Sequence, residues 1–119
     1  MLRIKRIYEP PAADDGCRIL VDRLWPRGLL KEKAQLDTWM KELAPSDDLR
    51  RWFGHDPERW EEFQRRYRAE LRSHSALLDE LCRNAQQTTV TLLFAARDTQ
   101  YNNAVVLKEV LESHSTKES

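Results

Sequence analysis

Glycine is scarce in this sequence of 119 residues. Only three glycines occur, and they are widely separated, at Gly16, Gly28 and Gly54. The dinucleotide-binding turn and the phosphate loop of nucleotide triphosphatases both need glycines close together, so neither class fits this chain. The sequence also contains no GxSxG nucleophile motif and no HExxH pair. We therefore expect no enzyme of the common cofactor-dependent types, and neither a cofactor nor a metal site.

Cysteine and long apolar runs are equally sparse. The two cysteines, Cys17 and Cys82, fit none of the common zinc spacings, and we expect both to be core residues in a reducing compartment. No segment reaches the ~18 apolar residues that would span a bilayer. The amino terminus, MLRIKRIYEPP, lacks the apolar stretch of a signal peptide. The expected location is the cytoplasm, with no membrane partner.

Charge of neither sign is in excess. The 20 lysines and arginines balance 20 aspartates and glutamates, which argues against a surface that binds nucleic acid. The basic run QRRYR at 64–68 follows Glu61 and Glu62 at a favourable helical ion-pair spacing, so it indicates a solvated helix face. The length favours a single domain, which we expect over 1–112, with a disordered tail at 113–119. The oligomeric state stays open.

The hydrophobic pattern predicts three strands and five helices. Runs of β-branched and apolar residues predict strands at 2–8, 17–23 and 88–96. Helical spacing of apolar residues predicts helices at 36–43, 46–54, 56–71, about 76–83, and from Asn102 or Asn103 to Leu111. Ser46 and Asp56 are expected N-caps, and Gly54 is an expected helix end.

These elements predict a small three-layer α/β sandwich. The apolar run from Val90 to Ala96 has no polar alternation after Thr91, so it indicates a strand buried on both faces. Such a strand needs helices above and below it, which favours a short, mostly parallel sheet with helices on both faces. The loop EPPAADDG is short for a parallel crossover, so the direction of strand 2–8 relative to strand 17–23 stays open.

Two polar segments leave the predicted sheet where ligands bind in such folds, at the carboxyl ends of strands. They are DRLWPRG, which follows Val21, and RDTQYNN, which follows Ala96. If the two strands are parallel neighbours, six polar side chains converge at one edge: Asp22, Arg23, Arg27, Arg97, Asp98 and Asn102.

The residue types at this edge favour an anionic ligand. Arginine offers a planar fork of donors to a phosphate or carboxylate, which Arg23, Arg27 and Arg97 would hold. Asp22 could serve as a general base or hold a sugar hydroxyl, and Trp25 could present an indole face to a ring. The alternative is structural: Asp22 pairs with an arginine, Trp25 is core and Arg27 is solvated.

Several longer strings carry a resemblance to a known family. They are RIY at 6–8, ILVDRLWPRGL at 19–29, WMKELAPS at 39–46, LRRWFGHDPERWEEF at 49–63 and LLFAARD at 92–98. The sequence resembles the YeaO-like branch of the domain of unknown function 488 family over about residues 2–112. The resemblance implies a compact cytoplasmic bacterial α/β domain with no established activity. The positions that match the family pattern are Asp22, Arg23, Trp25, Pro26, Arg27, Gly28, His55, Asp98 and Asn102.

One position departs from that pattern. Similar sequences often carry histidine where this chain has Tyr101. A tyrosine can donate a hydrogen bond but is a poor proton acceptor at neutral pH, so Tyr101 is assigned to binding.

Two functional hypotheses follow. The first is an enzyme, or a ligand-binding remnant of one, that acts on a phosphorylated or nucleotide-like small molecule. Its catalytic candidates are Asp22, His55 and Asp98, and its ligand-binding candidates are Arg23, Trp25, Arg27, Arg97, Tyr101 and Asn102. The second is a non-catalytic module that binds a protein or nucleic acid through a helical half rich in tryptophan, at Trp39, Trp52 and Trp60.

Overall fold

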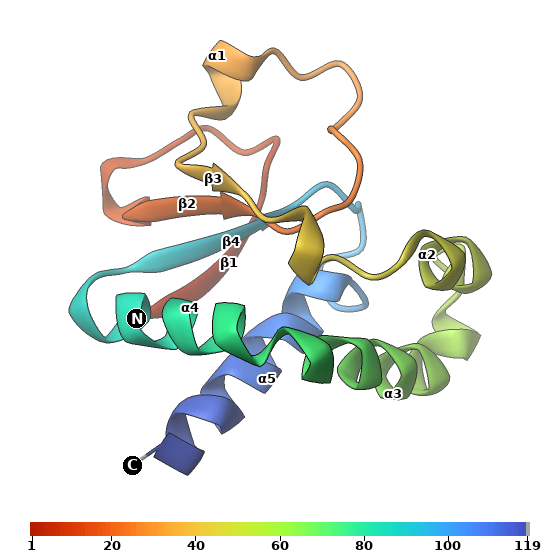
Figure 1. Ribbon diagram of the computed structural model, residues 1–119. Coiled ribbons are helices and arrows are strands. Elements are labelled where there is room, and N and C mark those ends of the chain that lie inside the picture. Colours follow the sequence, from red (N-terminus) through yellow and green to blue (C-terminus); the bar gives the residue numbers. More distant parts are fainter. Residues whose placement is uncertain (119) are drawn as a thin grey trace.

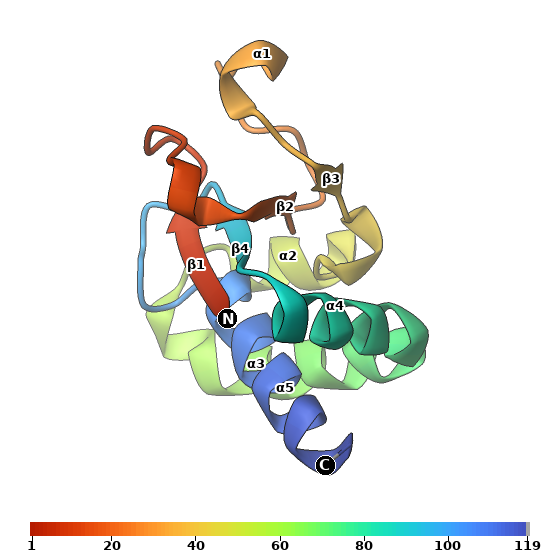
Figure 2. The ribbon, with the colours of Figure 1, turned by 90° about the vertical axis from the view of Figure 1, so that its left-hand side faces the viewer.

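A four-stranded parallel sheet forms the centre of the protein (Figures 1 and 2). The computed structural model describes residues 1–118, with side chains as far as His114. The strands are β1 (Leu2–Arg6), β2 (Cys17–Leu20), β3 (Thr38–Trp39) and β4 (Val90–Phe94). Their order across the sheet is β1-β4-β2-β3, and every pairing is parallel. The expected α/β class is confirmed, and β1 and β2, whose relative direction the sequence left open, run parallel.

Four of the five predicted helices are present, and the short helix α1 is an addition. The helices are α1 (Lys31–Ala34), α2 (Asp47–Phe53), α3 (Trp60–Leu71), α4 (Ser75–Gln87) and α5 (Asn103–Glu118). Single 3-10 turns occupy Ala13–Asp15, Lys41–Leu43, Pro57–Arg59 and Arg72–His74.

The predicted caps of the helical half are confirmed. Ser46 Oγ accepts a hydrogen bond from the Leu49 N–H at 3.2 Å, and Gly54 ends α2 in the left-handed conformation. Asp56 accepts from the Glu58 N–H at 3.0 Å, ahead of Pro57 at the first position of its turn.

The predicted helix at 36–43 is wrong. Residues Thr38 and Trp39 instead form β3 beside β2, and the Met40 N–H donates to the Leu20 carbonyl at 2.9 Å. The apolar residues of this segment are divided between the two faces of the sheet. Trp39 packs in a small cluster on one face, whereas Leu43 belongs to the large cluster on the other. The apolar residues of segment 36–43 therefore have helical spacing in the sequence, although the segment is not an α-helix.

The two faces of the sheet are covered unequally. Ile19, Leu92 and Phe94 belong to the large cluster, which α2 to α5 complete. Leu20 and Leu93 point to the opposite face, where the segment 22–37 and the one-turn helix α1 cover them. Figures 1 and 2 both show α1 on one side of the sheet and α4 and α5 on the other. The third layer of the predicted sandwich is therefore present but thin.

A buried ionic cluster fastens the thin layer to the sheet. Arg18 on β2 contacts the Asp15 carboxylate at 2.5 Å, and Lys5 on β1 reaches the same group at 3.1 Å. Arg18 Nη2 also donates to the Ala34 carbonyl at the end of α1, at 2.8 Å. Both Asp15 and Arg18 are buried, and the Thr91 hydroxyl of β4 donates to the Asp15 carbonyl at 2.6 Å. These contacts join three strands, a turn and the α1 segment.

The carboxyl-terminal helix is longer than the sequence indicated. Helix α5 continues to Glu118, past the expected domain end at 112. Residue 119 and the side chains after His114 lie outside the described residues, so the division into a domain and a disordered tail stays a prediction. Across residues 1–118, no helix has the length and apolar character needed to cross a membrane.

Candidate functional site

The carboxyl ends of β2 and β4 lie side by side and open into a pocket. The two strands pair in parallel from Cys17–Val90 to Leu20–Leu93, so the loops that follow them leave the sheet at the same edge. A pocket of about 730 Å³ lies there, formed by these loops together with α2 and the start of α5. All nine side chains selected from the sequence line it: Asp22, Arg23, Trp25, Arg27, His55, Arg97, Asp98, Tyr101 and Asn102.

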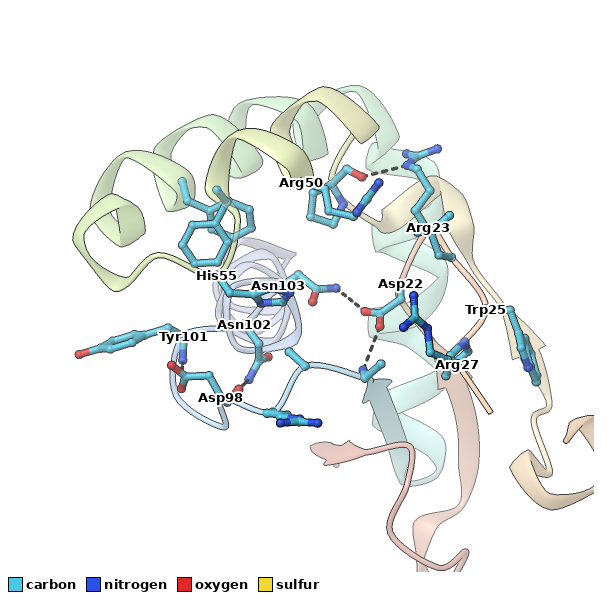
Figure 3. Close-up of a pocket in the computed structure, with 18 of the residues that line it drawn as sticks. Asp22, Arg23, Trp25, Arg27, Arg50, His55, Asp98, Tyr101, Asn102 and Asn103 are labelled. Atoms are coloured by element: carbon cyan, nitrogen blue, oxygen red, sulfur yellow. Dashed lines mark hydrogen bonds between the residues drawn. The ribbon is translucent and has the colours of Figure 1, made fainter. Parts of the chain in front are cut away.

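Asp22 occupies the centre of the pocket, between the two loops (Figure 3). Its Oδ2 accepts the Ala95 N–H at 2.9 Å, and its Oδ1 accepts from Asn103 Nδ2 at 3.1 Å. Burial raises the pKa of Asp22 above its usual value, and the bonds from Ala95 and Asn103 and the nearby charge of His55 offset only part of that effect. Asp22 is thus an oriented carboxyl group that the fold makes costly to ionise.

Asn103 is not among the predicted site residues, although the sequence indicates it as one of two possible starts of the last helix. Its Nδ2 donates both to Asp22 and to the Val21 carbonyl at 2.8 Å, which fixes the orientation of the amide. The signal in the sequence was the Asn-Asn pair: only one of them can cap α5, which leaves the other free to reach the end of β2.

Asn102 is the residue that caps α5. Its Oδ1 accepts the Val105 N–H at 3.1 Å, and its Nδ2 donates to the Asp98 carbonyl at 2.9 Å. Asp98 Oδ1 in turn accepts the Tyr101 and Gln100 N–H groups at 2.9 Å, and these two bonds lower the pKa of Asp98. The polar side chains of this loop are therefore engaged in building the amino-terminal end of α5 against the pocket.

The arginines of the pocket fall into two groups. Arg23 Nε donates to the Pro45 carbonyl at 2.9 Å, and Arg50, which the sequence did not single out, pairs with Asp47 at 2.7 Å. Arg27 and Arg97 are exposed, and within residues 1–118 their guanidinium groups have no ion pair and no hydrogen bond. Two cationic groups of the pocket are thus available to a ligand.

His55 lies across the pocket from Asp22 and Arg27 (Figure 3). It has a left-handed backbone with a φ of 57°, directly after Gly54 in the same conformation. Its ring centroid is 6.3 Å from that of Phe53, and its charge lowers the pKa of both Asp22 and Asp98. The turn at the end of α2 therefore presents His55 to both carboxylates.

The two aromatic candidates are packed against other rings. Trp25 lies 5.4 Å from Trp39 in an edge-to-face contact, and its indole N–H donates to the Leu29 carbonyl at 2.7 Å. Tyr101 lies 5.2 Å from Trp60, and its hydroxyl points away from Asp22 (Figure 3). Trp25 is consequently held in the small cluster, and Tyr101 forms part of the outer wall.

The tryptophans of the helical half are partly buried. Arg59 and Arg66 lie over the Trp52 ring at 5.2 and 4.3 Å, and Trp60 packs between Phe53, Phe63 and Tyr101. None of the tryptophans is among the exposed large hydrophobic residues of the described chain.

The residue set limits what the pocket can do chemically. Among the described residues, no serine, threonine or cysteine lines it, so the hydroxyl groups of the pocket are the phenols of Tyr8 and Tyr101. Four arginines and one histidine face two aspartates, which gives the pocket a positive balance. An oriented acceptor and unpaired guanidinium groups suit the binding of an anion that also carries hydrogen-bond donors.

Comparisons with known proteins place the whole chain in one family. The family model described as "Inactive DUF488-N3 subclade" matches residues 1–119. An uncharacterized protein of Mycobacterium tuberculosis (strain H37Rv) is 43% identical over 110 residues, which cover 92% of each chain. The Escherichia coli K12 protein named "Uncharacterized protein YeaO" is 42% identical over 112 residues, 94% of this chain and 97% of that protein. No solved structure gives a significant match.

Proposed function

Because the chain belongs to the DUF488 family, in a subclade whose description calls it inactive, we propose that its pocket binds a phosphorylated or nucleotide-like small molecule without transforming it. The observation that carries this proposal is the pair of unpartnered guanidinium groups, Arg27 and Arg97, in one pocket. Exposed arginines are common on protein surfaces, but these two border a cavity beside an oriented carboxyl group. The combination favours a specific anion over general solvation.

The size and walls of the pocket support a ligand larger than a simple ion. Its volume of about 730 Å³ lies within the range of ~300–1,000 Å³ that small-molecule sites occupy. Phe53 and Phe63 supply an apolar wall, and the exposed side chains of Tyr8 and Leu24 lie at the same cavity. A phosphate attached to an organic group would use both the cationic and the apolar parts.

Most other polar groups of the pocket already form hydrogen bonds within the protein, which supports binding over catalysis. Oδ1 of Asp98, a catalytic candidate, and Oδ1 of Asn102, a binding candidate, each accept hydrogen bonds from backbone N–H groups at the start of α5. Arg23 holds the segment before α2 through the Pro45 carbonyl. Asp22 remains as an acceptor, but among the described residues no serine, threonine or cysteine lines the pocket with it.

Thermal melting with ligands tests the proposal. We expect nucleoside monophosphates or sugar phosphates to raise the melting temperature of the wild type by several degrees, because a ligand at ~100 times its dissociation constant adds ~2.7 kcal/mol to the free energy of unfolding. Arg27→Ala and Arg97→Ala should each reduce that shift and leave the melting temperature without ligand nearly unchanged, since neither side chain has a protein partner.

Arg83→Ala is the matched control. Arg83 is an exposed arginine of α4, outside the pocket lining, so its removal changes the net charge equally and should preserve the ligand shift. The proposal is wrong if no phosphorylated compound shifts the wild type, or if Arg27→Ala and Arg97→Ala respond to ligand as the wild type does.

A further inference from the structure

We infer that Asp22 selects the ligand through a sugar hydroxyl: the pocket takes a phosphorylated sugar, free or as part of a nucleotide, whose hydroxyl donates to Asp22 while its phosphate contacts Arg27 and Arg97. This inference rests on the proposed function and names the part of the ligand that an anion site alone leaves open. It makes Asp22 a specificity-determining residue.

The hydrogen bonding around Asp22 leaves room for donors from a ligand. A carboxylate has about four lone-pair positions, and the protein donates to two of them, from Ala95 and Asn103. The Asn103 amide directs its N–H groups to Val21 and Asp22, and its oxygen accepts no hydrogen bond within the described residues. Two neighbouring acceptors therefore lie at the centre of the pocket, and adjacent hydroxyls of a sugar would satisfy both.

The distribution of charge in the pocket determines the orientation of the ligand. A phosphate placed against Asp22 would meet a carboxylate, whereas Arg27 and Arg97 carry unpaired positive charge. An ammonium group would pair with Asp22, but the four arginines that line the same pocket oppose a second cation. A neutral donor at Asp22 and an anion at the arginines satisfy both constraints, and a hydroxyl is such a donor.

The geometry agrees with that assignment. Arg27 and Arg97 are exposed, whereas Asp22 is partly buried and bonds to the Ala95 backbone, directly after β4, and to Asn103 at the start of α5. Figure 3 shows the Asp22 side chain between Asn103 and Arg27, and His55 lies on the side of Asp22 away from Arg27. A ligand whose phosphate stays near the exposed arginines would therefore extend its sugar towards Asp22.

Matched ligand pairs test the inference with the wild-type protein. Titration calorimetry would compare AMP with 2′,3′-dideoxy-AMP, and ribose 5-phosphate with 2-deoxyribose 5-phosphate. We expect the compound with more hydroxyls to bind about 10- to 100-fold more tightly in at least one pair, as a hydrogen bond to a charged acceptor would give. Discrimination within the AMP pair would indicate a nucleotide, and discrimination within the ribose phosphate pair would indicate a free sugar phosphate.

Two variants locate the effect. Asp22→Asn should reduce the discrimination to less than about threefold, because one amide position no longer accepts. Asp48→Asn is the control: it removes one negative charge from the exposed surface of α2, outside the pocket lining, and should preserve the discrimination.

Three outcomes would overturn the inference in different ways. Equal affinity within both pairs, with phosphate-dependent binding intact, removes the role of Asp22 and leaves the proposed function standing. Discrimination that survives in Asp22→Asn assigns the hydroxyl to another residue. No binding of any phosphorylated compound removes the proposed function and this inference with it. The ligand pairs decide the question in the wild type even if Asp22→Asn does not fold.

Discussion

Asp22 and Asp98 line one pocket, yet their surroundings shift their pKa values in opposite directions. Burial raises the pKa of Asp22, whereas backbone N–H groups of Tyr101 and Gln100 lower that of Asp98. As the pH falls, Asp22 therefore takes up a proton first, at a pH above the ordinary value of 3.8, while Asp98 keeps its charge. A protonated carboxyl group is a weaker acceptor for a ligand hydroxyl.

We accordingly expect hydroxyl discrimination to weaken in mildly acidic solution. The measurement is the ratio of affinities within one ligand pair over a pH series. The two ligands of a pair carry the same phosphate, so its own titration cancels in the ratio. A ratio that stays constant down to a pH below 3.8 would contradict the raised pKa of Asp22.

Two glycines of the chain should respond differently to alanine, although both have positive φ. A Cβ on Gly16 would lie 2.2 Å from the Thr89 carbonyl oxygen, which accepts the Cys17 N–H at 2.8 Å. Gly16→Ala should therefore lower the free energy of unfolding by about 3 kcal/mol or more, from steric overlap plus backbone strain. A Cβ on Gly28 meets nothing within 4 Å, so Gly28→Ala carries only the strain of about 1–2 kcal/mol.

Urea unfolding of both glycine variants measures that difference. Similar losses of unfolding free energy in Gly16→Ala and Gly28→Ala would show that Gly16 does not approach Thr89 so closely in solution.

At the scale of elements, local signals predicted α2, α3 and the start of α5 correctly. Ser46, Asp56 and Gly54 act within one turn of their own helix, so the sequence near them contains the necessary information. The segment 36–43 could not be predicted in this way. Its two strand residues depend on pairing with β2, and its apolar side chains are divided between two clusters that only the folded sheet separates.

The cap of α5 gives an element-scale prediction. Asn102→Ala removes the acceptor for the Val105 N–H and the donor to the Asp98 carbonyl, so it should cost about 1–2 kcal/mol of unfolding free energy. Asn102→Ser keeps a side-chain oxygen that can cap the helix, so it should lose less unfolding free energy than Asn102→Ala. Chemical denaturation of the two variants makes the comparison, and equal losses would mean that the cap contributes little.

At the scale of the molecule, the location of the pocket followed from the sequence once two strands were taken as parallel neighbours. Asp22 and Asp98 each come directly after such a strand or its short extension, and strand ends share one edge of the sheet. Arg50 and Asn103 were missed because their roles depend on how α2 and α5 are placed over that edge. Helix docking is set by long-range packing, which no local pattern reports.

The ionic cluster on the other face predicts how stability depends on pH. Burial alone would raise the pKa of Asp15, but hydrogen bonds from the Ala12 N–H, Lys5 and Arg18 lower it below 3.8. Its stabilising effect is therefore complete above that value and is lost as the pH falls through the lowered pKa.

Asp15→Ala should cost about 3–5 kcal/mol at neutral pH, because it leaves Arg18 buried without its partner. The difference from wild type should narrow below pH 3.8. Asp14→Ala, which breaks an exposed pair with Arg3, is the control and should change stability by less than about 1 kcal/mol. Unfolding free energies over a pH series test both, and a constant Asp15 penalty would exclude the ionic cause.

The strand order has a consequence for how the chain is made. β4 is the third of the chain's long strands to be synthesised, yet it lies between β1 and β2 and hydrogen-bonds to both. A nascent chain that ends before Val90 holds β1 and β2 with no ladder between them, and its apolar side chains have no complete sheet to cover. Completion of the sheet therefore waits until β4 has been synthesised, and until then the exposed strand edges are open to other chains in the cell.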